Sequence, residues 1–163
     1  MNYWIITDTH LGHNKLVDEG YRPKDFEISI LNNLLKQIKP TDVLICLGDV
    51  CIGSDAYWHN RIMQHWVGNK CWLVKGNHDN KSNSWYLNAG WDCVSESLTL
   101  NIYGKDILFS HCPNTKHDNF DLNIHGQLHN TLHHEIEGLT AKHKLLFIEH
   151  TYAPVSLRKF IGA

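Results

Sequence analysis

The sequence predicts an α/β fold, a single-domain α/β sandwich with mixed β-sheets flanked by helices. In the first half, short apolar runs alternate with segments of helical periodicity, which indicates strands and helices in alternation. In the second half, apolar and alternating runs follow one another around turn residues, which favours strands joined by hairpins. The chain of 163 residues, 42% of them hydrophobic, suits one domain over residues 1–163 whose core needs no disulfides.

Three strands and three helices are expected in the first half. The apolar, β-branched run YWIIT predicts a strand that leads into Asp8. Residues 24–39 place apolar side chains four positions apart, which predicts an amphipathic helix followed by Pro40. Similar patterns predict a strand at 42–48, a helix at 55–66, a strand at 71–76 and a helix at 83–90.

Strands dominate the expected second half. Residues 97–103 and 105–111 predict a hairpin with Gly104 and Lys105 at its turn. Further strands are expected at 120–126 and 144–157. No linker, repeat or low-complexity segment interrupts the chain, so these strands are assigned to the same domain.

Composition excludes several classes of protein. The net charge of −2 and the lack of a basic cluster argue against a long nucleic acid as a partner. No apolar run approaches the roughly 18 to 20 residues of a membrane helix, and the N-terminus lacks a signal-peptide pattern. The 5 cysteines include no CxxC pair, which favours reduced thiols in the cytoplasm, with Cys46 in the core. The sequence carries no indication of the oligomeric state.

Polar clusters follow four of the expected strands directly. The carboxyl ends of strands in open α/β sheets are where ligands gather, so these clusters are expected to converge on one edge. Their members are Asp8 and His10 after the first strand, Asp49 after the second, Asn77, His78 and Asp79 after the third, and His111 after a later one.

These side chains form a mixed oxygen and nitrogen ligand set. Asp8 and His10 are two positions apart, so they point the same way in an extended segment. Such a set suits Mn, Fe, Zn or Ni, and a carboxylate such as that of Asp49 can bridge two ions about 3.5 to 4 Å apart. The glycines that precede Asp49, Asn77 and Gln127 let the backbone turn sharply close to the ions.

Five short motifs resemble those of the calcineurin-like metallophosphoesterases. DTH, GDV, GNHD, SH and HGQLH match the family patterns D-x-H, G-D, G-N-H-[DE], H and G-H-x-H, in the same order, between Asp8 and His129. Each motif alone is weak, whereas the ordered set is specific. DTHLGH and the later APVSL also resemble a small, capless branch of this family.

The resemblance implies a role for each matching residue. Two divalent ions would activate a hydroxide for in-line attack on phosphorus and neutralise charge on the phosphoryl oxygens. His78 matches the family histidine that meets the phosphate or leaving-group oxygen, so it is the expected catalytic residue. The first ion would be held by Asp8, His10, the bridging Asp49 and His129, and the second by Asp49, Asn77 and His111.

Two positions depart from the family pattern. Gln127 replaces the first histidine of G-H-x-H, and its neutral amide oxygen is a weaker ligand than imidazole. The second site is then loose, filled only with substrate, or completed by Gln127, water or His125. Ile52 stands where some relatives carry a further aspartate, so His78 needs another partner, either Asp79 or a backbone carbonyl.

Other polar residues have weaker claims. His13 and Arg22 are candidate substrate contacts, because either reaches toward a phosphate from a nearby loop, although a solvated loop is the alternative. Lys75 is read as a surface lysine, and Trp58 and Trp66 as core residues. The remaining histidines considered are assigned surface or core roles; they are His59, His65, His117, His133, His134, His143 and His150.

We therefore expect a metal-dependent phosphoesterase that hydrolyses small phosphodiesters such as cyclic nucleotides at an open site. The alternatives are a phosphomonoesterase, a nuclease on short single strands, and a non-catalytic metal-binding scaffold in which Gln127 marks a weakened second site. A cysteine-dependent phosphatase is excluded because the chain has no Cys-x5-Arg loop.

Overall fold

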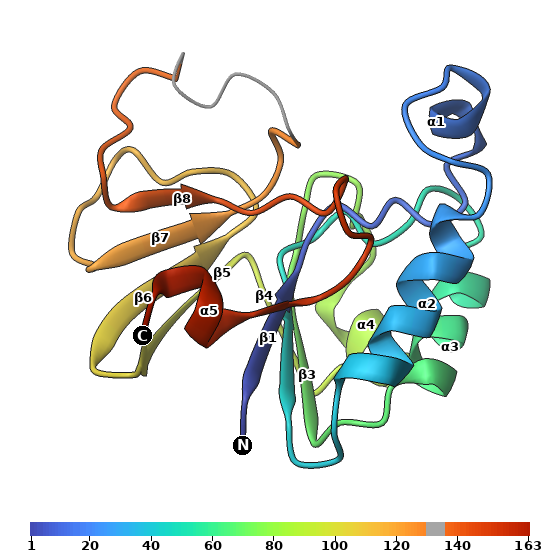
Figure 1. Ribbon diagram of the computed structural model, residues 1–163, viewed down its shortest axis with the longest axis horizontal. Helices are drawn as coiled ribbons and strands as arrows, with labels where there is room; N and C mark the ends of the chain where they lie inside the picture. Colours follow the sequence, from blue (N-terminus) through green and yellow to red (C-terminus); the bar gives the residue numbers. More distant parts are fainter. Residues whose placement is uncertain (130–135) are drawn as a thin grey trace.

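Two β-sheets lie face to face, and helices cover the outer face of the first (Figure 1). The computed structural model describes residues 1–129 and 136–163. The first sheet has the order β4-β3-β2-β1-β9 and the second the order β5-β6-β7-β8. Helices α2, α3 and α4 pack on the side of the first sheet that faces away from the second, which confirms the predicted fold class.

The first sheet is parallel except at one edge. Strands β1 to β4 run parallel to one another, and β9 pairs with β1 in the antiparallel sense. The connections between the parallel strands carry the helices, as expected of a β-α-β succession. The strands are β1 (Tyr3–Ile6), β2 (Val43–Cys46), β3 (Lys70–Val74), β4 (Cys93–Ser95) and β9 (Val155–Ser156).

The second sheet combines a hairpin with two parallel pairings. Strands β5 and β6 are antiparallel, whereas β6 pairs with β7 and β7 with β8 in the parallel sense. The turn of the hairpin lies at Tyr103 and Gly104, both at positive φ, and Lys105 pairs with Ile102 instead of belonging to the turn. The strands are β5 (Ser97–Ile102), β6 (Lys105–Ser110), β7 (Leu122–His125) and β8 (His143–Leu145).

The helices in the described part of the chain are α1 (Asn14–Asp18), α2 (Phe26–Gln37), α3 (Asp55–His65), α4 (Asn83–Asn88) and α5 (Leu157–Ile161). Amphipathic α2 buries Phe26, Ile30 and Leu34 against the first sheet, as its four-residue spacing predicts. Within the described residues, none of the helices has the length and apolar character needed to cross a bilayer.

Alternate residues of the buried strands serve two separate cores. On β1 and β2, Ile6 and Cys46 face the helices, whereas Ile5 and Ile45 face the second sheet. This pattern explains why the parallel strands read as continuous apolar runs instead of alternating ones. Cys46 is a buried core residue, as predicted, and burial raises the pKa of its thiol well above the usual value.

The segment 144–157, which was expected to form strand, does so only at its two ends. Strand β8 ends at Leu145, and β9 begins only at Val155, so the residues between them carry the chain from the second sheet back to the first. A turn closes on the carbonyl of Ile148, which accepts hydrogen bonds from the backbone of Thr151 and Tyr152. Short α1, β4 and α5 were also not predicted, because each spans too few residues to show a periodicity.

Candidate metal centre

Five loops bring the predicted site residues together where strands end. Each of the loops after β1, β2, β3, β6 and β7 supplies at least one of them. Parallel strands present their carboxyl ends at one edge of a sheet, and the facing edges of the two sheets meet here. The residues are Asp8 and His10, Asp49, Asn77 and His78, His111, and Gln127 and His129.

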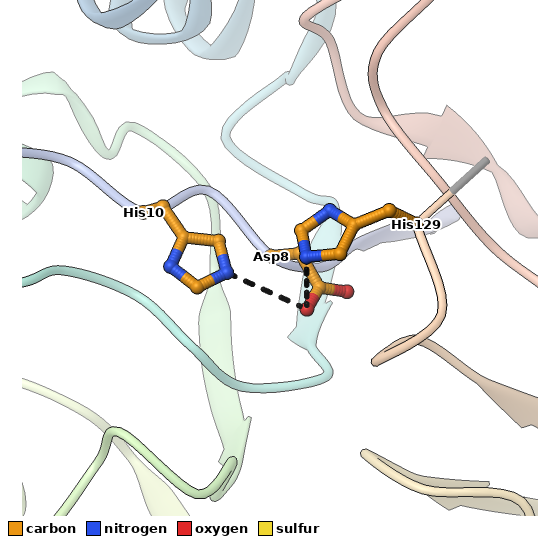
Figure 2. Close-up of side chains that lie close together, drawn as sticks. All are labelled: Asp8, His10 and His129. Atoms are coloured by element: carbon orange, nitrogen blue, oxygen red, sulfur yellow. Dashed lines mark ion pairs between the residues drawn. The ribbon is translucent and has the colours of Figure 1, made fainter. Parts of the chain in front are cut away.

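Asp8 lies at the centre of this cluster. Its Oδ1 is 3.8 Å from Nε2 of His10 and 3.9 Å from Nε2 of His129, and Figure 2 shows both rings beside the carboxylate. Candidate ligand atoms of these three residues lie within 4.8 Å of one another. A second such group is formed by Asp8, Asp49 and His111, so Asp8 belongs to both.

Asp49 faces the histidines of both groups. Its Oδ2 lies 3.6 Å from Nε2 of His10 and 3.4 Å from Nε2 of His111. Oδ1 of Asn77 is 3.2 Å from Nε2 of His111, which places the amide oxygen beside the second group. Both Asp8 and Asp49 are therefore placed to bridge two ions, and the assignment of the bridge to Asp49 stays a prediction.

The buried polar atoms of the site fit a divalent cation. Within residues 1–129 and 136–163, Oδ1 of Asp8 and both ring nitrogens of His10 are buried without a hydrogen-bond partner. Such atoms are costly unless a ligand satisfies them. Burial lowers the pKa of His10 to about 3, so its imidazole is neutral and has a lone pair to offer.

The charge at the second ligand group also favours a bound cation. Burial opposes protonation of His111, but Asp49 and Asp8 outweigh it and raise the pKa of His111 to about 9. Without a metal, a proton on this ring balances part of the charge of two buried carboxylates. The donor set therefore calls for positive charge at the point where a cation would be held.

The backbone of the site is strained. A φ between +46° and +68° places Asp8, His10, Asp49, Gln127 and His129 in the left-handed region, which non-glycine residues rarely adopt. Strain of this kind clusters at functional sites. Gly126 and Gly76 are equally constrained, because a Cβ on them would overlap the carboxylates of Asp8 and Asp49 respectively.

Asp79 ties the loops after β2 and β3 together. Its carboxylate accepts hydrogen bonds from the backbone N–H groups of Asp49, Val50 and Gly76. The suggestion that Asp79 partners His78 is therefore not supported, because these three amides occupy its carboxylate. It shapes the loops that carry the candidate ligands instead.

His78 sits at the open rim of the cluster. Its backbone N–H donates to Oδ1 of Asp49, and its side chain is 47% exposed with Nε2 4.0 Å from Oδ2 of Asp49. The ring centroid is 5.5 Å from that of His10. The ring is thus open to solvent beside Asp49, and its catalytic role stays a prediction.

The two candidate substrate contacts differ in placement. His13 lies beside the cluster, 5.6 Å from His10 between ring centroids, so its proposed role stays a prediction. Arg22 is buried and donates to the backbone carbonyls of Thr9 and Asp8 and to Oε1 of Glu149. These bonds argue against Arg22 as a phosphate contact, since its terminal nitrogens serve the protein's own backbone.

Gln127 is turned toward a thiol. Its backbone N–H donates to Oδ2 of Asp8, and its side-chain oxygen accepts from Sγ of Cys112 at 3.2 Å. His125 is fully buried in β7, with Nδ1 3.1 Å from the carbonyl oxygen of Gly126. Roles for Gln127 or His125 as metal ligands stay predictions.

Sequence reasoning missed Glu149 as a site residue. Its Oε1 lies 2.8 Å from Nδ1 of His129 and accepts from Arg22. Glu149 lies in the segment 144–157, which was assigned to a strand. Its position directly after the apolar run LLFI matches that of the polar clusters at the other strand ends and could have indicated a site residue. Thr7 was also missed; its hydroxyl donates to Oδ2 of Asp8 at 2.6 Å.

A sequence profile described as calcineurin-like phosphoesterase matches residues 1–159. The chain belongs to this family. Membership supports metal-dependent hydrolysis of phosphoesters in general, at a centre that in this family generally holds two divalent metals. No curated protein sequence matches the chain.

Several solved structures resemble this chain. A protein of unknown function from Aquifex aeolicus is 28% identical with a TM-score of 0.76, over 99% of this chain and 98% of its own. An archaeal phosphodiesterase is 17% identical with a TM-score of 0.50, over 88% of this chain and 82% of its own. The second similarity extends to the fold alone.

Two cavities border the candidate ligands of this phosphoesterase. One of about 420 Å³ is lined by residues that include Asn77, His111, Lys75 and Lys116. The other, of about 380 Å³, borders His129 and is lined by residues that include the aromatic side chains of Tyr21, His150 and Tyr152. Each cavity thus adjoins one of the two ligand groups.

The other predicted residues lie mostly as expected. Trp58 and Trp66 pack against the helix-side core. Lys75 is less exposed than predicted, with 15% of its side chain accessible and an ion pair to Glu96. His59 and His143 are buried, His117 and His150 are exposed, and His65 is intermediate, whereas His133 and His134 lie outside the described residues.

Proposed function

We propose that this phosphoesterase hydrolyses small phosphodiesters, with cyclic nucleotides among the candidate substrates. The observation that carries the proposal is the pair of cavities, one beside Asn77 and His111 and the other beside His129. A phosphodiester has two organic substituents on phosphorus, whereas a monoester has one. A site with space at both ligand groups suits the diester better.

In this proposal, two sets of side chains would each hold one divalent ion. Asp8, His10, Asp49 and His129 would hold one divalent ion, and Asn77 and His111 would complete the second together with Asp49. When bound, the ions would activate the attacking water and neutralise phosphoryl charge. The mixed oxygen and nitrogen donors favour Mn, Fe, Zn or Ni.

His78 would act on the departing group. Its exposed ring lies beside Asp49, where it can donate a hydrogen bond or a proton to the leaving oxygen. His13, whose ring lies near that of His10, would contact the substrate. The backbone anchors of His78 and the strained ligand loops keep these groups in place before a substrate arrives.

The proposed substrates are small and the proposed location is the cytoplasm. The net charge of −2 disfavours long nucleic acids, whose phosphates attract basic surfaces. Five free thiols are typical of a reducing compartment. No partner beyond the small phosphorylated substrate is proposed.

The test compares esters on metal-stripped protein reconstituted with Mn²⁺. Bis(p-nitrophenyl) phosphate should turn over faster than p-nitrophenyl phosphate, and a screen of cyclic nucleotides should give at least one natural substrate. The His78→Ala variant should lose diester turnover by about 100-fold. Asp25→Asn, which changes an exposed carboxylate at the start of α2, serves as the control.

Other outcomes identify the alternatives. Faster turnover of the monoester would indicate a phosphomonoesterase, and cleavage of short single-stranded oligonucleotides in preference to both would indicate a nuclease. A folded protein that shows no turnover with any divalent metal would overturn the enzymatic proposal and leave a metal-binding scaffold.

A further inference from the structure

A chain of charged groups connects the C-terminal part of the molecule to the metal centre. His129, Glu149 and Arg22 are in direct contact, and Arg22 in turn contacts the backbone of Asp8. We infer that Glu149 is a positioning residue that fixes the ring of His129 for metal binding, with Arg22 as its anchor. This inference rests on the proposed metal centre.

The two ring nitrogens of His129 face two different carboxylates. Nδ1 lies 2.8 Å from Oε1 of Glu149, and Nε2 lies 3.9 Å from Oδ1 of Asp8. A neutral imidazole carries one N–H, and the carboxylate of Glu149 can only accept. With the proton on Nδ1, the lone pair of Nε2 is directed to the candidate metal position beside Asp8.

Exposure, backbone conformation and ring stacking do not by themselves fix the orientation of the His129 ring. Its side chain is 33% exposed, and its backbone is in the left-handed region, at φ 49°. The ring stacks on His10, with centroids 5.2 Å apart, but stacking does not select a tautomer. The hydrogen bond to Glu149 is the contact that fixes both the rotation and the proton position of the ring.

Arg22 fixes Glu149 relative to the other ligand. Nη2 of its guanidinium lies 2.7 Å from both Oε1 of Glu149 and the carbonyl oxygen of Asp8, and Nη1 donates to Thr9. The side chain is 2% exposed and lies 5.1 Å from the ring centroid of Phe26. Arg22 and Glu149 thus connect the backbone of Asp8 to the ring of His129, in addition to the hydrogen bond from the backbone of Gln127 to Asp8.

The segment between β8 and β9 carries the residue that positions His129. Glu149 comes from that segment, which crosses between the sheets, and its Oε2 also accepts from the backbone of Ile148. This segment therefore places the carboxylate of Glu149 next to the ring of His129.

The test measures metal affinity and the His129 tautomer in wild type, Glu149→Ala and Glu149→Gln. Mn²⁺ affinity comes from titration calorimetry, and the tautomer from ¹⁵N-resolved NMR of the zinc-loaded and metal-free proteins at a pH where the ring is neutral. Asp25→Asn is the matched control, because it removes an exposed carboxylate at the start of α2 that belongs to neither candidate ligand group.

Wild type and control should show His129 protonated at Nδ1. Glu149→Ala should shift the metal-free ring toward the Nε2–H form and weaken first-site Mn²⁺ binding by roughly 10- to 100-fold. Glu149→Gln keeps an acceptor oxygen, so it should restore most of the Nδ1–H population and part of the affinity. That partial rescue separates positioning from a general loss of stability.

Several results would overturn the inference. They are an Nε2–H tautomer in wild type, an Mn²⁺ affinity in Glu149→Ala equal to that of wild type, or no rescue of the tautomer by Glu149→Gln. If Glu149→Ala does not fold because Arg22 is left buried without its partner, wild type and Glu149→Gln decide the matter. Failure of wild type to bind any metal would instead overturn the proposed function.

Discussion

The carboxylate of Asp79 accepts a hydrogen bond of 2.7 Å from the backbone N–H of Asp49. The same carboxylate accepts from Val50 and Gly76, so one buried side chain joins the loops that follow β2 and β3. Asp49 is a candidate ligand, and Gly76 precedes another, Asn77. The two loops therefore hold their ligands in a fixed relation before any metal binds.

We predict that Asp79→Ala lowers the free energy of unfolding by about 2 to 4 kcal/mol, because three backbone N–H groups, two of them buried, lose their acceptor. Urea unfolding of the metal-free protein measures the change. Asp18→Ala, at the exposed end of α1, should change stability by less than about 0.5 kcal/mol. Equal effects of the two substitutions would show that Asp79 does not hold the loops.

His59 makes stability depend on pH. Nδ1 of this buried ring accepts from Nε1 of Trp91, and burial lowers the pKa of His59 to about 4 from 6.5. The unfolded chain therefore binds the proton more readily between these values, and stability falls as the pH falls through this window. The contribution is about 2 kcal/mol between pH 7.5 and pH 5.

The His59→Gln variant isolates this effect, because Gln retains an acceptor for Trp91 but does not titrate. Unfolding free energies of the metal-free proteins from pH 7.5 to pH 5 should fall less steeply for the variant than for wild type. Parallel curves would mean that His59 is not the group responsible.

Gly126 is predicted to tolerate no side chain. A Cβ at this position would overlap Oγ1 of Thr7 and Oδ2 of Asp8, so Gly126→Ala must displace Asp8. Mn²⁺ affinity should fall by at least about 10-fold. Gly20→Ala is the control, because its Cβ meets open space and costs only the strain of a positive φ, roughly 1 kcal/mol. Retained affinity in Gly126→Ala would contradict the tight fit of this loop.

Gln127→His should tighten the second metal site several-fold, because imidazole is a stronger ligand than an amide oxygen for these ions. Histidine also tolerates the left-handed backbone of this position better than most residues. Calorimetric titration with Mn²⁺ resolves the second equivalent. Cys112→Ala, which only frees the side-chain oxygen of Gln127, should not reproduce the gain. Unchanged second-site affinity in Gln127→His would show that Gln127 does not limit the site.

Local patterns predicted the long elements well. Helix α2 and strands β2 and β6 follow from periodicity and buried apolar runs, which depend only on neighbours in sequence. The segment 144–157 was expected to be strand because it is apolar. Its apolar residues are buried where the chain crosses between the sheets, and burial there does not require strand geometry. Short β4 is defined by pairing with β3, a contact that no local pattern encodes.

The candidate ligands were predictable because strand ends converge by topology. The residues that hold these ligands in place were not predictable, since their contacts join parts of the chain that are far apart in the sequence. From the sequence, Arg22 was predicted to contact a phosphate. In the structure it is buried and hydrogen-bonded to Asp8 and Glu149, so it has a structural role. Asp79 likewise belongs to a ligand motif but binds backbone amides.

The central claim is metal-dependent phosphodiester hydrolysis at a centre that depends on Asp8, the residue common to both ligand groups. The most direct measurement determines bound Mn²⁺ and turnover of bis(p-nitrophenyl) phosphate on the same reconstituted samples of wild type and Asp8→Ala. Wild type should retain two ions per chain and hydrolyse the diester, whereas folded Asp8→Ala should retain neither ion firmly and lose turnover. Turnover by Asp8→Ala at the wild-type rate, or a folded wild type without bound metal and without turnover, would contradict the claim.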